Sequence, residues 1–234
     1  MFRSKSFNIP RAVDCSSLTR SKSISDMYTA SVDMKIFITI KEVSPKEASR
    51  ATDVMMDETM TPDDWYYFYS PKPDEDKIKW EKRYSDSIEV INYIARNAVL
   101  QSMPPVLGRA NYPGANKFFF VAYFKGVPVG ALQLSEYDKD EHDIPKVDFL
   151  ATHCGIRGCG ILLIEYAVNK SQQLGKKGKL RLQPYSGAKI AYMNMGFIEE
   201  KGNKNNLELH PDERTDKWIW SNNDQSYKCK CFCI

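Results

Sequence analysis

The chain has 234 residues, a hydrophobic fraction of 42% and a formal net charge of +3. This length and apolar fraction are enough for one domain with a buried core. The net charge is too small to indicate a nucleic-acid partner, so none is expected. No stretch approaches the roughly eighteen consecutive apolar residues of a membrane-spanning helix, and no signal peptide follows the start, so a cytoplasmic protein is expected.

The placement of the cysteines does not predict disulfide bonds. Two lie in one glycine-rich segment and three lie close together at the end of the chain, so a reducing compartment is expected. The six cysteines are Cys15, Cys154, Cys159, Cys229, Cys231 and Cys233. No metal site is predicted, because the terminal cysteines lack a second ligand pair and the histidines are scattered.

Residues 1–33 are rich in serine and arginine and show little apolar periodicity, which predicts a disordered or targeting leader. A mitochondrial presequence has this bias, but Asp14, Asp26 and Asp33 count against it. A bacterial secretion leader for delivery into a host cell also fits the composition, and so does an inert tail. These alternatives stay open.

The first part of the predicted domain is one strand followed by helices. Apolar and polar residues alternate over 34–43 as in a strand, after which Ser44 and Pro45 form a capped helix start that leads to Met60. An aromatic loop follows over 61–73. Residues 74–100 predict one long helix or two shorter ones, with an apolar face available for burial.

Short apolar runs later in the chain predict an antiparallel meander and further strands. A charged excursion at 137–146 interrupts the meander. The expected strands are 34–43, 117–124, 129–134, 147–150, 180–183, 207–209 and 218–220. The sequence therefore predicts an α+β fold of three layers, in which helices flank a mixed, mostly antiparallel sheet of about seven strands.

The segment 147–168 reads as a strand, a glycine-rich turn and a helix. The extended apolar run enters a turn that contains Gly155, Gly158 and Gly160, and Arg157 adds a positive charge there. Glycines remove side chains where the backbone approaches a ligand, and a helix start presents unpaired N–H groups that attract anions. The segment predicts a phosphate-binding turn, although a glycine-rich loop without a ligand gives the same pattern.

A second motif lies at 180–197, where a strand and a turn lead to a short helix carrying Tyr192 and to an exit at Gly196 and Phe197. Together the two motifs resemble the GNAT superfamily of acetyl-CoA-dependent N-acetyltransferases. In that family an Ala-x-x-x-Tyr-x-x-x-Gly-Phe segment supplies a tyrosine near the thioester sulfur. Ala188 completes this pattern here.

The glycine turn matches the family's Arg/Gln-x-x-Gly-x-Gly/Ala pyrophosphate pattern in part. Gly158 and Gly160 occupy the glycine positions, whereas Gly155 stands where the family has arginine or glutamine, a change for which Arg157 can compensate. A Rossmann dinucleotide site also places a glycine turn between a strand and a helix. The late position of the turn, the lack of an acidic residue after the strand 180–183 and the tyrosine motif count against that alternative.

The resemblance covers 34–220 and implies a GNAT-like sheet with acetyl-CoA as co-substrate. It implies transfer of an acetyl group to an amine-bearing acceptor, which is a protein lysine, an N-terminus or a small molecule. The alternative is a catalytically silent module that binds acyl-CoA or a protein partner. The residues expected to bind the co-substrate are Phe149, Leu150, Thr152, Gly155, Ile156, Arg157, Gly158, Cys159 and Gly160.

Tyr192 is the candidate general acid, because a phenol with an ordinary pKa of about 10 stays protonated at neutral pH and can donate toward sulfur. Asp148 and Glu136 are the candidates for the base that removes the amine proton. His153 is a third side chain for that role, and a water chain is a further alternative. The sequence does not identify the acceptor: the aromatic residues 65–69 and the acidic segment 138–143 are compatible with a basic acceptor such as lysine or a polyamine, and equally with solvated surface.

The end of the chain, Lys-Cys-Lys-Cys-Phe-Cys-Ile, resembles a CaaX prenylation box. Cys231 lies four from the end, and Cys229 is a candidate for a second acylation. Two lipids, or one lipid with basic charge, hold a protein at the cytoplasmic face of a eukaryotic membrane. A flexible tail is therefore expected over 221–234, compatible with a host-directed bacterial effector; a cysteine-rich tail without lipid is the alternative.

Overall fold

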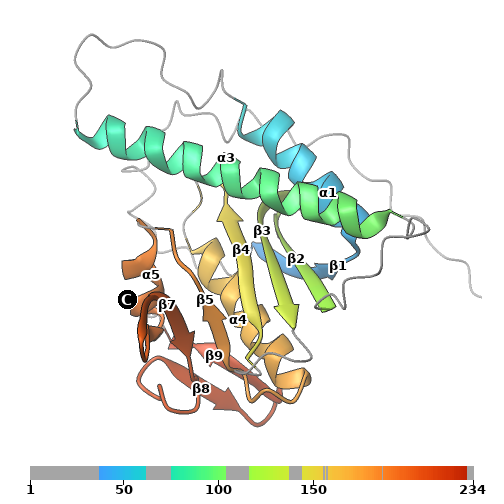
Figure 1. Ribbon diagram of the computed structural model, residues 1–234. Helices are drawn as coiled ribbons and strands as arrows, with labels where there is room; N and C mark the ends of the chain where they lie inside the picture. Colours follow the sequence, from blue (N-terminus) through green and yellow to red (C-terminus); the bar gives the residue numbers. More distant parts are fainter. Residues whose placement is uncertain are drawn as a thin grey trace, which may run out of the picture.

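The computed structural model describes residues 37–61, 75–103, 116–136, 144–154, 156, 158–185 and 187–230. The predicted leader, most of the aromatic loop and the acidic segment lie outside these residues. In chain order the elements (Figure 1) are β1 (Ile38–Val43), α1 (Pro45–Val54), η4 (Met55–Thr59), α3 (Glu75–Ser102), β2 (Asn116–Phe124), β3 (Val127–Glu136), β4 (Lys146–Thr152), α4 (Cys159–Gln173), β5 (Leu180–Leu182), α5 (Lys189–Asn194), β6 (Ile198–Glu200), β7 (Asn203–Leu209), β8 (Trp218–Ser221) and β9 (Ser226–Cys229).

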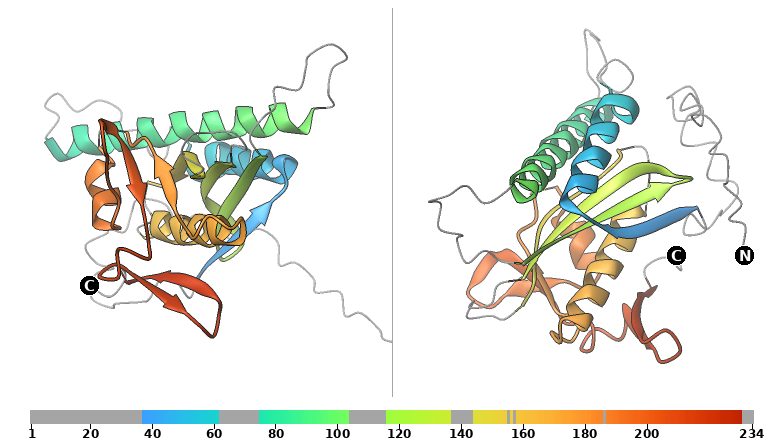
Figure 2. Two further views of the ribbon diagram at one scale, coloured as in Figure 1. Left: turned by 60° about the horizontal axis from the view of Figure 1, so that its bottom comes forward. Right: turned by 90° about the vertical axis from the view of Figure 1, so that its right-hand side faces the viewer.

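Seven strands form one mixed sheet in the order β1-β2-β3-β4-β5-β7-β6. Neighbouring strands are antiparallel, except that β4 and β5 run parallel. Helices α1 and α3 cover one face of the sheet, and α4 covers the other (Figure 2). The predicted α+β class, with helices flanking a mostly antiparallel seven-stranded sheet, is confirmed.

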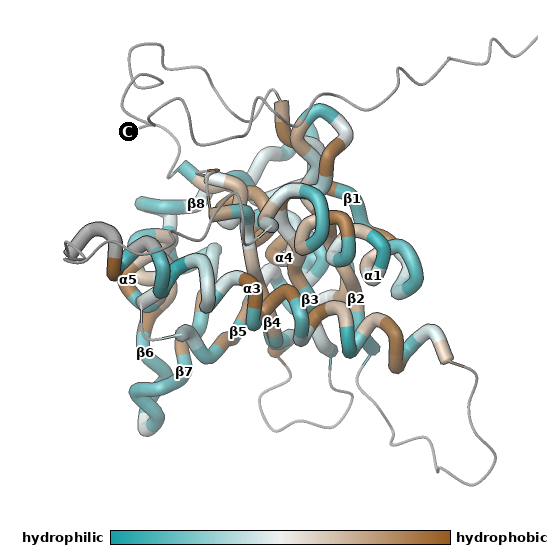
Figure 3. Tube along the Cα trace, turned by 90° about the horizontal axis from the view of Figure 1, so that it is seen from above, coloured by the Kyte–Doolittle hydropathy of each residue, from teal (hydrophilic) through white to brown (hydrophobic). Residues whose placement is uncertain are grey.

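Side-chain alternation along the strands divides the core into two layers. Phe119 packs with Ile91 and Ile94 of α3, whereas its neighbour Phe120 packs with Leu163 and the rest of the α4 layer. Seen from above, hydrophobic and hydrophilic residues alternate along α3 (Figure 3), which is the pattern of a helix with one buried face. The sheet is therefore held between two apolar layers.

The predicted helices are present with small differences in their ends. Ser44 caps α1, because its Oγ accepts a hydrogen bond from the Glu47 N–H at 3.2 Å. This helix continues into the π-helical segment η4 and ends at Thr59. The second helical region is a single helix, α3, rather than two shorter ones. No described helix has the length and apolarity needed to cross a membrane.

The seventh strand of the sheet is not the one predicted. β6 takes that place, whereas β8 pairs with β9 in a separate two-stranded sheet. Trp218 at the start of β8 is 1% exposed and donates its Nε1–H to the Met195 carbonyl at 2.7 Å. This tryptophan fills the core beside the end of α5, so the prediction for 218–220 was right about a strand and wrong about its sheet.

Helix α4 holds β9 through two polar side chains one turn apart. Asn169 accepts from the Tyr227 N–H at 2.7 Å and donates to the Tyr227 carbonyl at 3.0 Å. Glu165 accepts from the Cys229 N–H at 2.8 Å. These side chains pair with the strand backbone as a neighbouring strand would. The folded part of the chain therefore extends through β9, past the boundary at 220 that the sequence predicts.

Candidate functional site

Strands β4 and β5 separate after a short paired stretch. They are neighbours in register only at Lys146 with Arg181 and at Val147 with Leu182. β5 also pairs with β7, while β4 runs on to Thr152 alongside β3. Beyond Val147, the edge of β4 that faces β5 has no strand partner among the described residues. Its backbone N–H and C=O groups are therefore available to a ligand.

A cavity of about 440 Å³ occupies this opening. Residues 147–152 of β4 form one wall, and 182–185 at the end of β5 form another. Helix α5 contributes Ala188 and Tyr192, and α3 covers the cavity with its N-terminal half. The cavity brings together elements that are far apart in the sequence, and it is lined by both Asp148 and Tyr192.

A β-bulge sets the position of Asp148. Val147 pairs with Leu134 and Phe149 pairs with Gln133, so Asp148 is the extra residue between two pairs. A bulge interrupts the regular alternation of a strand and redirects side chains, and bulges are frequent beside active sites. The carboxylate of Asp148 consequently lines the cavity under α3.

Two buried side chains of β3 hold the Asp148 carboxylate. Gln133 donates from Nε2 to Asp148 Oδ2 at 2.8 Å, and the Ser135 hydroxyl donates to the same oxygen. Gln133 is 1% exposed and Ser135 is fully buried, so solvent does not compete for these bonds. Hydrogen bonds to a carboxylate are strong and directional, and this pair fixes the orientation of Asp148 at the cavity wall.

Tyr192 reaches the same cavity from α5. Its side chain is 9% exposed and packs edge-to-face against Phe197, with ring centroids 5.6 Å apart. Burial raises the pKa of Tyr192 to about 12, because the charged phenolate is poorly solvated there. The phenol therefore stays protonated at neutral pH and can donate a hydrogen bond to an anion formed beside it.

The tyrosine motif is a compact helical unit. Ala188 is the N-cap of α5 and lines the cavity, and the helix closes at Gly196, whose φ of 98° is in the left-handed region that favours glycine. The Phe197 N–H then bonds to the Tyr192 carbonyl at 3.2 Å. The motif spacing thus fixes the tyrosine between the cavity and the phenylalanine behind it.

The start of α4 presents backbone donors that have no partner among the described residues. Gly158 is the N-cap with φ 81°, and no side chain caps this helix. The amides of Gly158, Cys159 and Gly160 make no hydrogen bond to another described residue, whereas the Ile156 N–H is already bonded to the His153 carbonyl at 3.1 Å. N–H groups at the positive end of a helix dipole are donors of the kind that bind anions.

Gly160 connects this helix start to the cavity. A Cβ at Gly160 would lie 3.7 Å from Leu150 Cδ2 and 3.8 Å from Thr152 Cγ2, which is ordinary contact distance. Leu150 and Thr152 also line the cavity. The packing of the protein itself does not require a glycine at 160. Gly155 and Arg157, which belong to the same predicted turn, lie outside the described residues.

Cys159 contributes its backbone rather than its thiol. Its side chain is fully buried, and burial raises the pKa of the thiol to about 12. A Cβ at Gly130 of β3 would lie only 2.8 Å from Cys159 Sγ, so Gly130 permits the close approach of α4 to the sheet. This close approach positions the start of α4 beside β4.

Two other candidate residues, Glu136 and Cys229, do not line the cavity. Glu136 lies at the end of β3, where its Oε2 accepts from Asn116 Nδ2 at 3.4 Å, and it is not among the lining residues. Cys229 is 3% exposed within the core, so the folded chain does not present its thiol for acylation. Cys231 lies outside the described residues.

His153 is a structural residue rather than a base. Its side chain is 1% exposed, and its Nε2 lies 2.9 Å from the Thr59 carbonyl. Burial lowers the pKa of the imidazole, which keeps the ring neutral and lets Nε2–H donate to that carbonyl. His153 therefore ties the end of β4 to η4.

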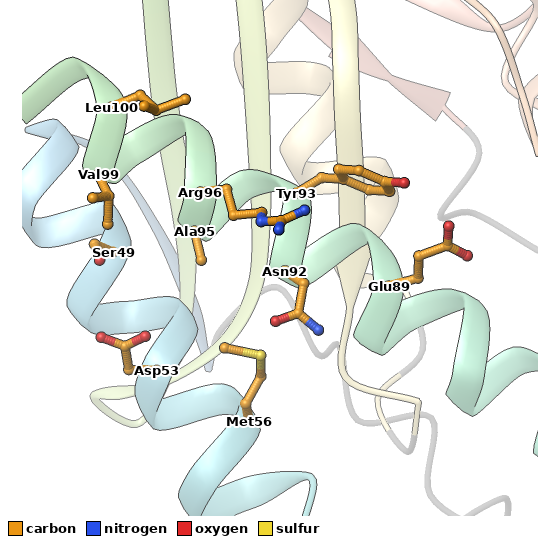
Figure 4. Close-up of a pocket in the computed structure, with 10 residues that line it drawn as sticks. All are labelled: Ser49, Asp53, Met56, Glu89, Asn92, Tyr93, Ala95, Arg96, Val99 and Leu100. Carbon is orange, nitrogen blue, oxygen red and sulfur yellow. The ribbon is translucent and has the colours of Figure 1, made fainter.

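A second cavity, here called the α1–α3 groove, lies on the outer side of the two N-terminal helices and has a volume of about 730 Å³. Ser49, Asp53 and Met56 of α1 line it together with residues of α3 (Figure 4). None of the residues predicted from the sequence to act in a site lines this groove. Tyr93, which does line it, stacks on Phe149 at 5.3 Å and closes the core between the groove and β4.

Sequence reasoning missed the residues that support Asp148 and those of α3 that cover the cavity. Gln133 and Ser135 are polar residues at alternate positions of an otherwise apolar strand. Buried polar side chains usually have a hydrogen-bond partner, so these two residues were the signal in the sequence that could have indicated a polar site. The α3 residues recur at helical spacing, but the sequence does not show which face of the helix meets the sheet.

No family model matches the chain, and no curated protein matches it. Solved structures of similar arrangement include the PaiA N-acetyltransferase of Thermoplasma acidophilum in complex with coenzyme A, at 18% identity over 73% of this chain and 96% of that chain, with a TM-score of 0.39. A GNAT-family acetyltransferase of Streptococcus pneumoniae is 17% identical over 74% and 96%, with a TM-score of 0.40. An acetyltransferase of Thermus thermophilus is 14% identical over 74% and 96%, with a TM-score of 0.39.

Proposed function

We propose that the chain transfers an acetyl group from acetyl-CoA to an amine acceptor. The observation that carries this proposal is the opening between β4 and β5, where a free strand edge borders a cavity lined by Asp148 and Tyr192. Aminolysis of a thioester needs a held acyl donor, an amine without its proton and a donor for the departing sulfur. The opening offers a group for each of these needs.

The backbone would hold acetyl-CoA. The amides of its pantetheine arm can pair with the free edge of β4 between Asp148 and Thr152, as an added strand would. Its diphosphate can lie at the start of α4, against the amides of Gly158, Cys159 and Gly160, which bond to no other described residue. Because Gly160 lies close to the side chains of Leu150 and Thr152, the two binding regions are continuous.

Asp148 and Tyr192 would share the proton chemistry. The amine nitrogen forms a bond to the acetyl carbon and the C–S bond breaks, giving an N-acetyl amide and CoA. Asp148, held by Gln133 and Ser135, accepts the proton that the nitrogen loses, directly or through one water. Tyr192 donates a hydrogen bond to the departing sulfur. Its pKa of about 12 exceeds the roughly 8.5 of an ordinary thiol, so the thiolate takes its proton from solvent rather than from the phenol.

Replacing Gly160 separates binding of the co-substrate from folding. A carboxylate in the first turn of a helix stabilises it by about 0.3–1 kcal/mol, but here it would repel a diphosphate. We expect Gly160→Asp to bind CoA about tenfold more weakly in calorimetric titration, with an unchanged or higher free energy of unfolding in urea. Gly160→Ala is the matched control, because the structure has room for its Cβ.

Equal CoA affinity in the wild type and Gly160→Asp would contradict this location for the diphosphate. If the wild type binds neither CoA nor acetyl-CoA at submillimolar concentration, the transferase and a silent acyl-CoA-binding module are both eliminated. Binding without turnover over a panel of amines would select the silent module.

Removing the Tyr192 hydroxyl tests its role in turnover. We expect Tyr192→Phe to lower kcat by about a hundredfold while leaving the Kd for CoA unchanged. The loss should be the same from about pH 6 to 10, because a pKa of about 12 keeps the phenol protonated throughout. Tyr166→Phe, on the exposed side of α4, is the control. Unchanged turnover in Tyr192→Phe would show that the tyrosine only packs.

Lipid attachment at Cys231, and with it a place on a host membrane as an effector, is a separate proposal that rests on the last four residues. The burial of Cys229 leaves Cys231 as the stronger of the two candidate positions. An isoprenoid label should enter the wild-type chain in a eukaryotic lysate and not the Cys231→Ser variant. No incorporation in the wild type would remove the membrane proposal.

A further inference from the structure

We propose that Trp218 is a positioning residue for Tyr192, and that the C-terminal hairpin of β8 and β9 holds it in place for that role. The inference rests on the proposed acetyl transfer, in which Tyr192 donates to the departing sulfur. Trp218 is buried and does not line the cavity, so it acts through the tyrosine and not on the substrates. The bonds that form and break in the reaction are unchanged.

Helix α5 is too short to hold Tyr192 in place by itself. It has six residues, whereas isolated helices shorter than about 12–15 residues are marginal in water. Its N-cap residue, Ala188, has no side-chain oxygen that could accept from the first N–H groups of the helix. The position of the tyrosine therefore depends on what the rest of the protein bonds to this helix.

Trp218 bonds to the C-terminal end of α5. The last carbonyl groups of a helix have no partners inside the helix and must find them elsewhere. The Tyr192 carbonyl accepts from the Phe197 N–H at 3.2 Å, and the Met195 carbonyl accepts from Trp218 Nε1 at 2.7 Å. All four residues belong to one buried apolar cluster. The indole therefore fixes the end of the helix three residues beyond the tyrosine.

The segment before β8 also packs against the exit of α5. Gly196 follows the helix with a φ of 98°, and a Cβ at this position would lie 3.4 Å from both Cβ and Cγ of Lys217. The Trp218 N–H bonds to the Arg214 carbonyl at 2.8 Å, which closes the turn that leads into β8. The hairpin thus meets the end of α5 through two neighbouring residues, Lys217 and Trp218.

The other strand of the hairpin is anchored to α4. Trp218 pairs with Cys229 in the two-stranded sheet. Glu165 of α4 accepts from the Cys229 N–H, and Asn169 bonds to both backbone groups of Tyr227. The hairpin therefore connects α4, whose start would bind the diphosphate, with α5, which carries the tyrosine. This connection sets where the phenol lies relative to the bound co-substrate.

A double-mutant cycle tests whether Trp218 acts through Tyr192. Trp218→Phe keeps an aromatic ring in the core and removes the donor to the Met195 carbonyl. The assay uses acetyl-CoA with whichever of a lysine peptide, spermidine or an aminoglycoside the wild type acetylates fastest. We expect kcat to fall about tenfold, an effect of the size of one hydrogen bond, while the Kd for CoA is unchanged. In the Tyr192→Phe background the same change should alter kcat by less than about twofold, because the hydroxyl that it positions is already absent.

Trp220→Phe is the matched control. Trp220 lies in the same strand but packs edge-to-face on Tyr227, with ring centroids 4.9 Å apart, so this variant should keep the wild-type kcat. If Trp218→Phe does not fold, Asn169→Ala takes its place in the cycle, because it releases β9 from α4 and changes no residue of α5. A fall in kcat of about threefold that disappears in the Tyr192→Phe background is then expected.

A fall of the same size in both backgrounds would overturn the inference, because Trp218 would then support the fold without acting through the tyrosine. An unchanged kcat in Trp218→Phe, or an equal fall in Trp220→Phe, would overturn it as well. In each of these cases the wild type acetylates its acceptor, and the proposed transfer stands. If the wild type binds CoA and acetylates none of the three amines, the proposed transferase activity fails, and the role of Trp218 in it fails too.

Discussion

Strands β4 and β5 keep only two residue pairs, and the backbone of β4 beyond Val147 consequently faces an opening instead of a neighbouring strand. A continuous sheet would satisfy every one of these backbone groups and leave no place for a ligand. β5 is held on its other side by β7, so the separation is built into the strand order rather than left to a loop. The cavity, the short helix α5 and the start of α4 all border this opening.

Within the opening, polar groups that are costly to bury are used to orient one carboxylate. Gln133 and Ser135 lie in the middle of an apolar sheet, and each donates a hydrogen bond to the Asp148 carboxylate. The bulge that makes Asp148 an extra residue is what brings it within reach of both. On the opposite wall, burial keeps Tyr192 protonated. A fixed acceptor and a permanent donor therefore face one cavity.

Local sequence patterns predicted the elements better than their pairing. The alternation in the first strand, the Ser44–Pro45 cap and the glycine at 196 are local features, and each gave the correct element. Trp218 begins a segment that reads as a strand, but its burial against Met195 assigns it to another sheet, a long-range effect that the pattern does not contain.

The sequence predicts a site residue correctly where a local motif fixes its position. It cannot do so where the position depends on the register between two strands. Tyr192 follows from the spacing of its motif, whereas Asp148 and Glu136 were equivalent until the bulge placed one in the cavity and left the other at the strand end. Cys229 stands in a sequence that resembles a free tail. Glu165 of α4, far earlier in the chain, bonds to its backbone and keeps it in the fold.

Amide chemical shifts of the isotope-labelled chain during titration with CoA test the central claim most directly. The account predicts that the largest changes fall on two separate stretches, the amides of 158–160 at the start of α4 and those of 148–152 along β4, at a common saturation. Changes confined to the α1–α3 groove, or saturable binding that leaves both stretches unmoved, would contradict the claim that the opening between β4 and β5 holds the acyl donor.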